Sequence, residues 1–266
     1  MKQLSYKLWG IHKQKMCLIA ARTSNGKSVF AINIAYDLAK QGHKVMFLSL
    51  EMPNEKILER MLCLDQKIDN YELLKNGYNN SKEIREKFDR FNNSKIKNNL
   101  IISDCIGKDW SFIEHIFTKL TTKPDVIILD HINEIRGSYS QKQAIDEYLS
   151  KIRESCIRNN FAAIICAQVN RVAPAEKDKE PSLHHLKGSG TLEEIADQVI
   201  LLHWDWHYNN EKNKNEILIN IAKNRDGITG RMKMSFKPEY YLITDLEEEQ
   251  KHIGKILNPW DEEEEA

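Results

Sequence analysis

The 266-residue sequence predicts an α/β fold, in which a mostly parallel, twisted sheet is flanked by helices and followed by a C-terminal β-hairpin. Three observations lead to this prediction. Short apolar runs alternate with segments of helical periodicity along the chain. The runs are apolar throughout and too short for helices, as is typical of strands buried on both faces of a parallel sheet. Late in the chain, two further strand-like segments surround Asp226-Gly227 and Thr229-Gly230, which favours a hairpin.

The expected elements follow one another in a regular order. Apolar runs predict strands at residues 16–20, 45–50, 100–103, 126–129, 162–166 and 199–202. Helical periodicity predicts helices at residues 28–40, 54–66, 109–121 and 141–159. The hairpin is expected at 216–222 and 231–236. Residues 67–99 are polar and predict surface helices with loops, whereas the charged residues 172–190, with their prolines and glycines, predict an exposed loop.

Composition and charge narrow the classes of function. Lysine plus arginine and aspartate plus glutamate both total 39, so the formal net charge is +0. A protein that coats DNA by charge alone would be basic overall, so any contact with nucleic acid must be local or must arise when several copies align their basic loops. The N-terminus lacks the apolar block of a signal peptide, and no apolar stretch is long enough to cross a bilayer. The sequence therefore predicts a cytoplasmic protein without membrane attachment.

The cysteines argue for a reducing compartment. All five are scattered without C-x-x-C spacing and stand mostly in apolar surroundings: Cys17, Cys63, Cys105, Cys156 and Cys166. Buried, reduced thiols are therefore expected in preference to metal ligands or disulfides. The absence of a G-x-G-x-x-G pattern argues separately against a protein kinase or a dehydrogenase.

The segment from Ala21 to Ser28 has the features of a phosphate-binding loop. Its sequence, Ala-Arg-Thr-Ser-Asn-Gly-Lys-Ser, follows an expected strand and opens an expected helix, which is the context that a P-loop requires. Backbone N–H groups here would cradle the phosphates of ATP, helped by the helix dipole. The residues expected to bind the nucleotide are Ser24, Asn25, Gly26, Lys27, Ser28 and Val29. Lys27 would reach the β- and γ-phosphates, and Ser28 would bind Mg²⁺.

Two further strands end in an acidic residue. Asp130 follows the run 126–129, and the carboxyl edge of a parallel sheet is where ligands bind, so Asp130 fits coordination of Mg²⁺, directly or through water. Glu51 follows the run 45–50 and could polarise an attacking water molecule. Alternatively, Glu51 only caps the segment that begins near Pro53. The residues alone leave these two roles of Glu51 open.

Five blocks of the sequence resemble the C-terminal motor domain of the DnaB-like replicative helicases, which are hexameric ring motors. The blocks are residues 19–28, 48–52 with 60–63, 129–130, 167–171 and 221–230. The similarity extends over about residues 8–245, and the family's phosphate loop usually begins with alanine, as it does at Ala21. The resemblance implies a RecA-like P-loop NTPase fold and an ATP-dependent, 5′–3′ translocase and helicase that hydrolyses ATP between subunits.

Residue roles follow from the same resemblance. Glu51 matches the carboxylate that orients the attacking water, and Asp130 matches the Walker B acid. Gln168 matches the residue that senses the γ-phosphate. Arg225 matches an arginine finger that reaches the ATP of the neighbouring subunit, with Lys223 beside it. A guanidinium stabilises the negative charge of a phosphoryl transition state, so a finger supplied in trans makes hydrolysis depend on assembly.

The resemblance also implies a DNA-binding loop at Lys187, Gly188, Ser189 and Gly190, which would contact the phosphates of single-stranded DNA. Phosphate contacts carry no sequence information, so sequence-independent binding is expected. Two departures from the family stand out. The family usually has Arg-Glu-Ser-Gly where this chain has Lys-Gly-Ser-Gly, which keeps the charge but loses the bidentate fork of arginine. Thr23 replaces a usual proline, a change expected to affect the stiffness of the loop rather than its chemistry.

The resemblance implies one motor domain at residues 1–247. The run of five acidic residues from Asp261 to Glu265 favours a flexible, acidic tail at 248–266. The expected partners are single-stranded DNA, further copies of the chain in a hexamer, and a loader, primase or polymerase. The family's N-terminal collar domain has no counterpart here, so the sequence is either an excised domain or a naturally short form. Two other functions remain open. One is a RecA-fold ATPase that loads or remodels a partner protein or DNA without ring unwinding, and the other is a non-catalytic nucleotide-gated module.

A cluster of aromatic residues follows the run 199–202. It comprises His203, Trp204, Trp206, His207 and Tyr208. Aromatic side chains could stack on nucleobases. Packing against the hairpin or a neighbouring subunit is the favoured interpretation, because the family does not contact bases with this segment.

Overall fold

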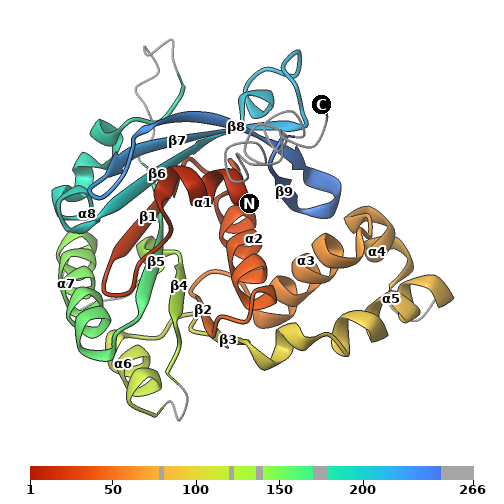
Figure 1. Ribbon diagram of the computed structural model, residues 1–266, viewed down its shortest axis with the longest axis horizontal. Helices are drawn as coiled ribbons and strands as arrows, with labels where there is room; N and C mark the ends of the chain where they lie inside the picture. Colours follow the sequence, from red (N-terminus) through yellow and green to blue (C-terminus); the bar gives the residue numbers. More distant parts are fainter. Residues whose placement is uncertain (78–80, 120–122, 136–139, 170–178, 247–266) are drawn as a thin grey trace, which may run out of the picture.

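The computed structural model describes residues 1–77, 81–119, 123–135, 140–169 and 179–246 (Figure 1). The side chains of residues 187–191 and the acidic tail at 248–266 lie outside the described parts. Nine strands form one sheet in the order β3-β2-β4-β5-β1-β6-β7-β8-β9. The strands are β1 (Met16–Ala21), β2 (Val45–Ser49), β3 (Leu100–Asp104), β4 (Val126–Asp130), β5 (Ala162–Gln168), β6 (Gln198–His203), β7 (Glu216–Asn224), β8 (Gly230–Lys237) and β9 (Leu242–Thr244).

Strands β1 to β6 are mutually parallel, and β7, β8 and β9 extend the sheet in antiparallel fashion. The predicted mostly parallel sheet with a C-terminal hairpin is therefore confirmed. The described α-helices are α1 (Lys2–Leu8), α2 (Lys27–Lys40), α3 (Asn54–Gln66), α4 (Asn70–Asn76), α5 (Lys82–Asn92), α6 (Trp110–Lys119), α7 (Gln141–Asn159) and α8 (Gly190–Ile195). Short 3₁₀ helices are η1 (Lys95–Asn98), η2 (Ile132–Glu134), η3 (Leu183–Ser189), η4 (Asp205–His207) and η5 (Pro238–Tyr240). No described helix is long and apolar enough to cross a membrane.

Helices cover both faces of the sheet, so the core has two layers (Figure 1). Successive side chains of a strand point to opposite faces. Cys17 and Ile19 of β1 therefore pack in the cluster that contains α2 and part of α3, while Met16 and Leu18 pack in the cluster that contains α6 and α7. This two-sided burial is why the parallel strands read as continuous apolar runs.

The register of the parallel strands sets the position of the site. Ala21 at the end of β1 lies beside Gln168 at the end of β5. Ser49 at the end of β2 lies beside Asp130 at the end of β4. The carboxyl ends of four strands thus meet at one edge of the sheet, which is where open α/β sheets bind ligands.

The prediction of an exposed loop at 172–190 is wrong for residues 183–190, which are helical. Residues up to 178 lie outside the described parts, but η3 and α8 make the chain helical from Leu183 to Ile195. Leu186 and Leu192 are each 3% exposed and pack in the α7-side cluster. Burial of these two leucines favours helical structure over the loop that the local prolines and glycines suggested.

Three other details differ from expectation. The strand β3 is not buried, because it forms an edge of the sheet and its side chains are partly or fully exposed. Helix α1 and strand β9 were not expected, and they are held together: the backbone N–H groups of Lys2 and Gln3 donate to Asp245, which follows β9. Aspartate at a helix N-terminus is favourable because it satisfies free N–H groups.

Asn33, in α2, fixes the turn before β9. Its amide donates to the carbonyls of Val29 and Tyr241 at 2.8 and 2.7 Å, and its side-chain oxygen accepts from the N–H of Ile243 at 2.9 Å. The residue is 3% exposed, and Tyr241 has a left-handed backbone with φ 52°. The side chain of Asn33 therefore supplies hydrogen-bond partners to the backbone carbonyl of Tyr241 and the backbone N–H of Ile243 in this turn.

Replacing Asn33 with leucine is expected to lower the free energy of unfolding by about 1–3 kcal/mol, because buried backbone groups of the turn lose their partners. Urea denaturation would measure this change. Asn210→Leu, at an exposed position, is the control and is expected to change stability by less than about 0.5 kcal/mol. Equal stability of the two variants would contradict the role assigned to Asn33.

Candidate nucleotide-binding site

The loop between β1 and α2 is built to receive an anion. Gly26 precedes α2 with a left-handed φ of 79°, and a Cβ added to it would approach Ile217 to 3.3 Å, so glycine is required here. Helix α2 has no acidic residue in its first turn. Its free N–H groups and its positive dipole end therefore face the cavity without a carboxylate from the helix itself, which is the usual arrangement for binding phosphate.

Asn25 shapes this loop from inside the protein. It is 1% exposed, and its side-chain oxygen accepts from the N–H of Trp204 at 3.0 Å. Its amide donates to the Tyr208 hydroxyl at 2.8 Å and to the Thr23 carbonyl at 3.0 Å, and its backbone N–H donates to Arg22. Asn25 was expected among the nucleotide-binding residues, but the structure uses its polar groups to hold the loop in shape.

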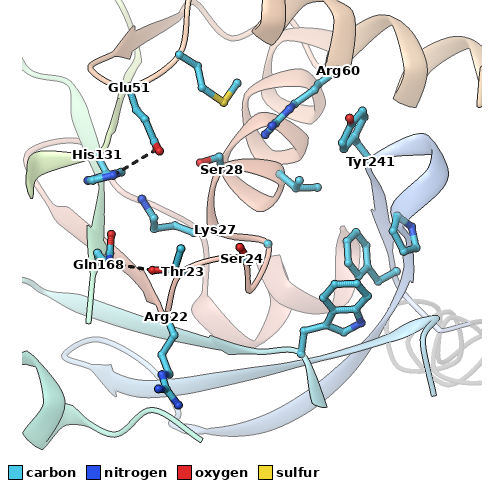
Figure 2. A pocket seen from close by; sticks show the side chains of 16 residues that line it. Arg22, Thr23, Ser24, Lys27, Ser28, Glu51, Arg60, His131, Gln168 and Tyr241 are labelled. Atoms are coloured by element: carbon cyan, nitrogen blue, oxygen red, sulfur yellow. Dashed lines mark hydrogen bonds and ion pairs between the residues drawn. The ribbon is translucent and has the colours of Figure 1, made fainter. Parts of the chain in front are cut away.

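A cavity of about 340 Å³ opens beside the loop (Figure 2). It is lined at one end by polar side chains and at the other by aromatic ones. The polar end includes Thr23, Lys27, Ser28, Glu51, His131 and Gln168. The aromatic end includes Arg60, Trp204, Phe236, Pro238 and Tyr241. The two ends lie on opposite sides of the start of α2, so an elongated ligand could cross the loop with its charged part at the polar end.

The polar end brings together four of the predicted catalytic residues. The Lys27 ammonium lies 3.2 Å from the Asp130 carboxylate, and their side chains are only 10% and 3% exposed. The Glu51 carboxylate lies 3.3 Å from Nε2 of His131. The amide of Gln168 donates to the hydroxyl of Thr23 at 2.9 Å (Figure 2).

Two of these contacts refine the sequence analysis. Helix α3 has no side-chain cap, and the described contact of Glu51 is with His131, so the capping role of Glu51 finds no support. The hydroxyl of Thr23 binds Gln168, so the departure from proline changes chemistry as well as stiffness, because a proline side chain could not accept this bond.

Burial and the Lys27 ammonium lower the pKa of His131 from its usual value. This shift favours the neutral imidazole. The formal charges at this end are then two negative, on Glu51 and Asp130, and one positive, on Lys27. Binding of an anion would therefore depend on the N–H groups of the loop and on a cation bound together with the anion.

Ser28 and Asp130 fit a magnesium ion. Both supply hard oxygen ligands, and Asp130 meets Lys27 behind the cavity wall. The described residues contain no cluster of three or more metal-binding side chains. Magnesium usually retains several water molecules and binds one or two protein oxygens together with substrate phosphates, so two protein ligands suffice.

The aromatic end was missed by the sequence analysis. The Arg60 guanidinium lies 5.1 Å from the ring centroid of Tyr241, and Trp204 packs edge-on against Phe236 at 5.1 Å. These residues come from α3, the link after β6, the end of β8 and the turn before β9. No motif joins such distant segments, although Arg60 did stand in one of the blocks of resemblance. The contact of Trp204 with Phe236 confirms that the aromatic cluster packs against the hairpin.

Lys223 and Arg225 do not line the cavity of their own chain. The Lys223 ammonium donates to the carbonyl of Glu193 at 2.6 Å, and Arg225 donates to the carbonyl of Glu194 at 2.9 Å. Both carbonyls are at the C-terminal end of α8, where cations are favourable. Burial and the neighbouring Arg225 lower the pKa of Lys223.

Asp197 anchors Arg225 to the sheet. Its side chain is 1% exposed and accepts from the N–H of Met16 at 2.9 Å and from Arg153, and it lies 3.3 Å from the Arg225 guanidinium. Burial raises the pKa of Asp197, but the hydrogen bond from Met16 and the contact with Arg153 outweigh it, so the pKa lies below its usual value.

The predicted DNA-binding residues span the junction of two helices. Lys187, Gly188 and Ser189 end η3, and Gly190 begins α8. Their side chains lie outside the described parts of the structure, as do residues 170 and 171 of a block of resemblance. The described backbone shows that these four residues lead directly into the helix whose far end holds Lys223 and Arg225.

The chain is also similar in sequence and in fold to known proteins. Residues 1–245 match the family described as DnaB-like helicase C terminal domain. The chain is 32% identical over 246 residues to the replicative DNA helicase DnaC of Bacillus subtilis, and 31% identical over 246 residues to DnaB of Geobacillus stearothermophilus. Each match covers 90% of this chain and 54% of the relative, so the chain spans about half the length of these curated relatives.

Two solved structures are also similar. One, described as a DnaB-like replicative helicase and its interactions with primase, has a TM-score of 0.83 at 26% identity and covers 93% of this chain and 61% of that chain. The other, described as an ATPase domain, has a TM-score of 0.82 at 26% identity and covers 92% of this chain and 89% of that chain.

Replacing Asp197 with asparagine is expected to lower the free energy of unfolding at pH 7 by about 1.5–3 kcal/mol, the usual value of hydrogen bonds to a charged group. The lowered pKa means that this stabilisation is present above the usual pKa of aspartate and is lost as the pH falls through the lower, folded-state value. The difference between wild type and Asp197→Asn is therefore expected to shrink below about pH 4, as measured by urea denaturation across pH.

Asp226→Asn is the matched control, because Asp197 and Asp226 both contact Lys15, at 3.7 Å and 3.2 Å, but the side chain of Asp226 is 48% exposed. Its effect is expected to stay below about 1 kcal/mol. A difference between wild type and Asp197→Asn that did not vary with pH would show that the charge of Asp197 is not what stabilises the fold.

Proposed function

Because the chain belongs to the family of DnaB-like helicase C-terminal domains, we propose that it is an ATP-hydrolysing motor that moves along single-stranded DNA and unwinds duplex DNA as a ring of identical subunits. The observation that carries this proposal is the meeting of Lys27, Glu51 and Gln168 around one cavity beside the phosphate loop. A nucleotide-gated module without catalysis would need the loop but not the carboxylate and the amide beside it.

ATP would lie across the start of α2. Its triphosphate would accept hydrogen bonds from the free N–H groups of the loop and helix. Lys27 would contact the β- and γ-phosphates, and Ser28 and Asp130 would bind Mg²⁺. Its base would lie at the aromatic end, where the flat guanidinium of Arg60 and the ring of Tyr241 already face each other at 5.1 Å. A planar base suits such a site because it can stack on a flat guanidinium or on an aromatic ring.

Hydrolysis would use the polar end. Magnesium supplies charge neutralisation on the phosphates. Glu51 would accept a hydrogen bond from the attacking water and orient it. Gln168 donates one N–H of its amide to Thr23, and the same amide carries a second N–H that could donate to a γ-phosphate. Because Gln168 ends β5, such a contact would give this strand a means to respond to the state of the nucleotide.

Arg225 and Lys223 would act on the nucleotide of a neighbouring subunit. They do not line their own cavity, and their charged groups are held at the C-terminal end of α8. A ring built from one repeated head-to-tail contact can present them to the next cavity. Hydrolysis would then require assembly, and six subunits are the number that the family resemblance implies.

DNA would bind at the junction of η3 and α8, where Lys187 to Gly190 stand. Movement of this junction would displace the far end of α8, whose backbone carbonyls accept hydrogen bonds from Arg225 and Lys223. This connection supports a coupling between DNA contact and the trans-acting cations. The 5′–3′ direction is proposed from the family resemblance.

The wider setting is also part of the proposal. The motor domain would occupy residues 1–247, with the acidic residues 248–266 as a tail. The protein would act in the cytoplasm during DNA replication. A solved relative is described together with its interactions with primase, and a primase, loader or polymerase is proposed as a partner of this chain as well.

ATP hydrolysis is expected to be strongly stimulated by unstructured single-stranded DNA and to rise cooperatively with protein concentration, because a complete site needs two subunits. Steady-state assays with and without an oligonucleotide, over a range of protein concentrations, would measure both effects. Lys27→Ala is expected to lower the rate by about 10²-fold or more. A rate indifferent to DNA and to concentration would instead favour an ATPase that loads or remodels a partner.

A mixing experiment tests the trans action of Arg225. Arg225→Ala is expected to reduce kcat by about 10³-fold, the usual effect of an arginine finger. In an equal mixture with Lys27→Ala, roughly one interface in four combines an intact loop with an intact arginine, so activity is expected to reappear. Mixtures that stay as inactive as the separate variants would argue that Arg225 acts within its own subunit.

A further inference from the structure

The carboxylate of Glu51 is poorly held by its own segment. It follows β2 and precedes α3, which begins only at Asn54, and its side chain is 51% exposed. The polar contact that the described structure gives it is with Nε2 of His131, at 3.3 Å. A long side chain on a short exposed link has many rotamers, and a group that must orient water cannot act from most of them.

We propose that His131 is the positioning residue for Glu51, holding one oxygen of its carboxylate so that the other is directed at the attacking water. This inference rests on the proposed ATP-hydrolysing function. His131 is suited to the task because its own position is fixed: its side chain is 4% exposed and directly follows Asp130 at the end of β4. Figure 2 shows its ring beneath Glu51, on the same side of the cavity as Lys27.

The segment that carries His131 is rigidly anchored. Its turn η2 is closed by hydrogen bonds from Glu134 to His131 and from Ile135 to Ile132. Ile132 and Ile135 are 0% and 4% exposed and pack in the α7-side cluster. A side chain on such a base holds its partner with little freedom, which is what a supporting residue must do.

The same segment reaches two other residues of the site. Asp130 meets Lys27, and the side chain of Asn133 accepts from the backbone N–H of Gln168 at 2.7 Å. Contacts from Asp130, His131 and Asn133 therefore lead to Lys27, to the Glu51 carboxylate and to the backbone of Gln168. His131 supplies the one that leads to Glu51.

The chemistry of imidazole also fits. With a proton on Nε2, the ring can donate a hydrogen bond to the Glu51 carboxylate 3.3 Å away, and it can do so in either charge state. A carboxylate has two oxygens, so one can be held while the other stays free to accept from water. Glu134, whose carboxylate lies 3.7 Å from the same nitrogen and is 52% exposed, is the other acidic group within reach.

The test compares variants that separate the hydrogen bond from the bulk of the ring. His131→Phe keeps the ring and loses the donor, and is expected to lower kcat by about 10- to 100-fold while the affinity for a non-hydrolysable ATP analogue changes less than about twofold. His131→Gln can still donate from this position and is expected to recover most of kcat. His131→Asn is too short to reach Glu51 and is expected to resemble His131→Phe.

Glu134→Gln is the matched control, expected to leave kcat within about twofold of wild type because Glu51 keeps its donor. Thermal unfolding of every variant separates loss of function from loss of fold, and the comparison of glutamine with asparagine holds even if the phenylalanine variant is unstable.

The decisive measurement is the double variant in single-turnover assays. In a Glu51→Gln background, His131→Phe is expected to change the rate by less than about twofold, because a residue that acts through Glu51 has nothing left to position. The inference would be overturned if His131→Phe lowered the hydrolysis rate by the same factor in the wild-type and Glu51→Gln backgrounds. It would also be overturned if His131→Asn kept the kcat of wild type. If Glu51→Gln alone leaves kcat unchanged, the proposed catalytic role of Glu51 fails instead, so the two failures are distinguishable.

Discussion

The alignment of strand ends is the constraint on which the rest of the structure depends. Parallel pairing places Ala21 beside Gln168 and Ser49 beside Asp130, so groups far apart in the chain reach one edge of the sheet. A slip of one residue in either pair would turn these side chains to the opposite face. Burial of apolar residues on both faces of the sheet prevents such a slip, and the two-layered core is therefore also what defines the site.

That alignment has an electrostatic consequence. It buries the Lys27 ammonium against the Asp130 carboxylate, and a buried charge is tolerated only when it is paired. An arriving triphosphate with its metal ion can replace each partner by a stronger one: phosphate oxygens for Lys27 and the cation for Asp130. The ion pair thus stabilises the site without ligand, and in the proposed function its two members are the groups that would bind the nucleotide and its metal ion.

Local patterns in the sequence predicted the parallel core and part of the polar end of the site. Apolar runs mark buried strands, Lys27 opens the helix after the phosphate loop, and Glu51 and Asp130 follow or end strands. The roles of Gln168 and Glu51 came from the family resemblance. The aromatic end was not predicted, since Arg60 and Tyr241 meet only through tertiary packing. For the same reason, burial of Leu186 and Leu192 made helical a region whose prolines and glycines favoured a loop.

The antiparallel part of the sheet explains how a nucleotide site can be connected to a neighbour. Strand β7 begins close to the phosphate loop, where Ile217 approaches Gly26, and ends at Lys223 and Arg225, held by α8 and by Asp197. Asp197 in turn binds the N–H of Met16, at the start of β1, whose other end enters the phosphate loop. Strands β1 and β7 thus each connect the phosphate loop to the region of Lys223 and Arg225. Packed strands transmit displacement because the protein interior resists compression. A shift at the cavity would therefore reach Lys223 and Arg225, the cations proposed to act on a neighbouring subunit, through rigid elements and without a flexible relay.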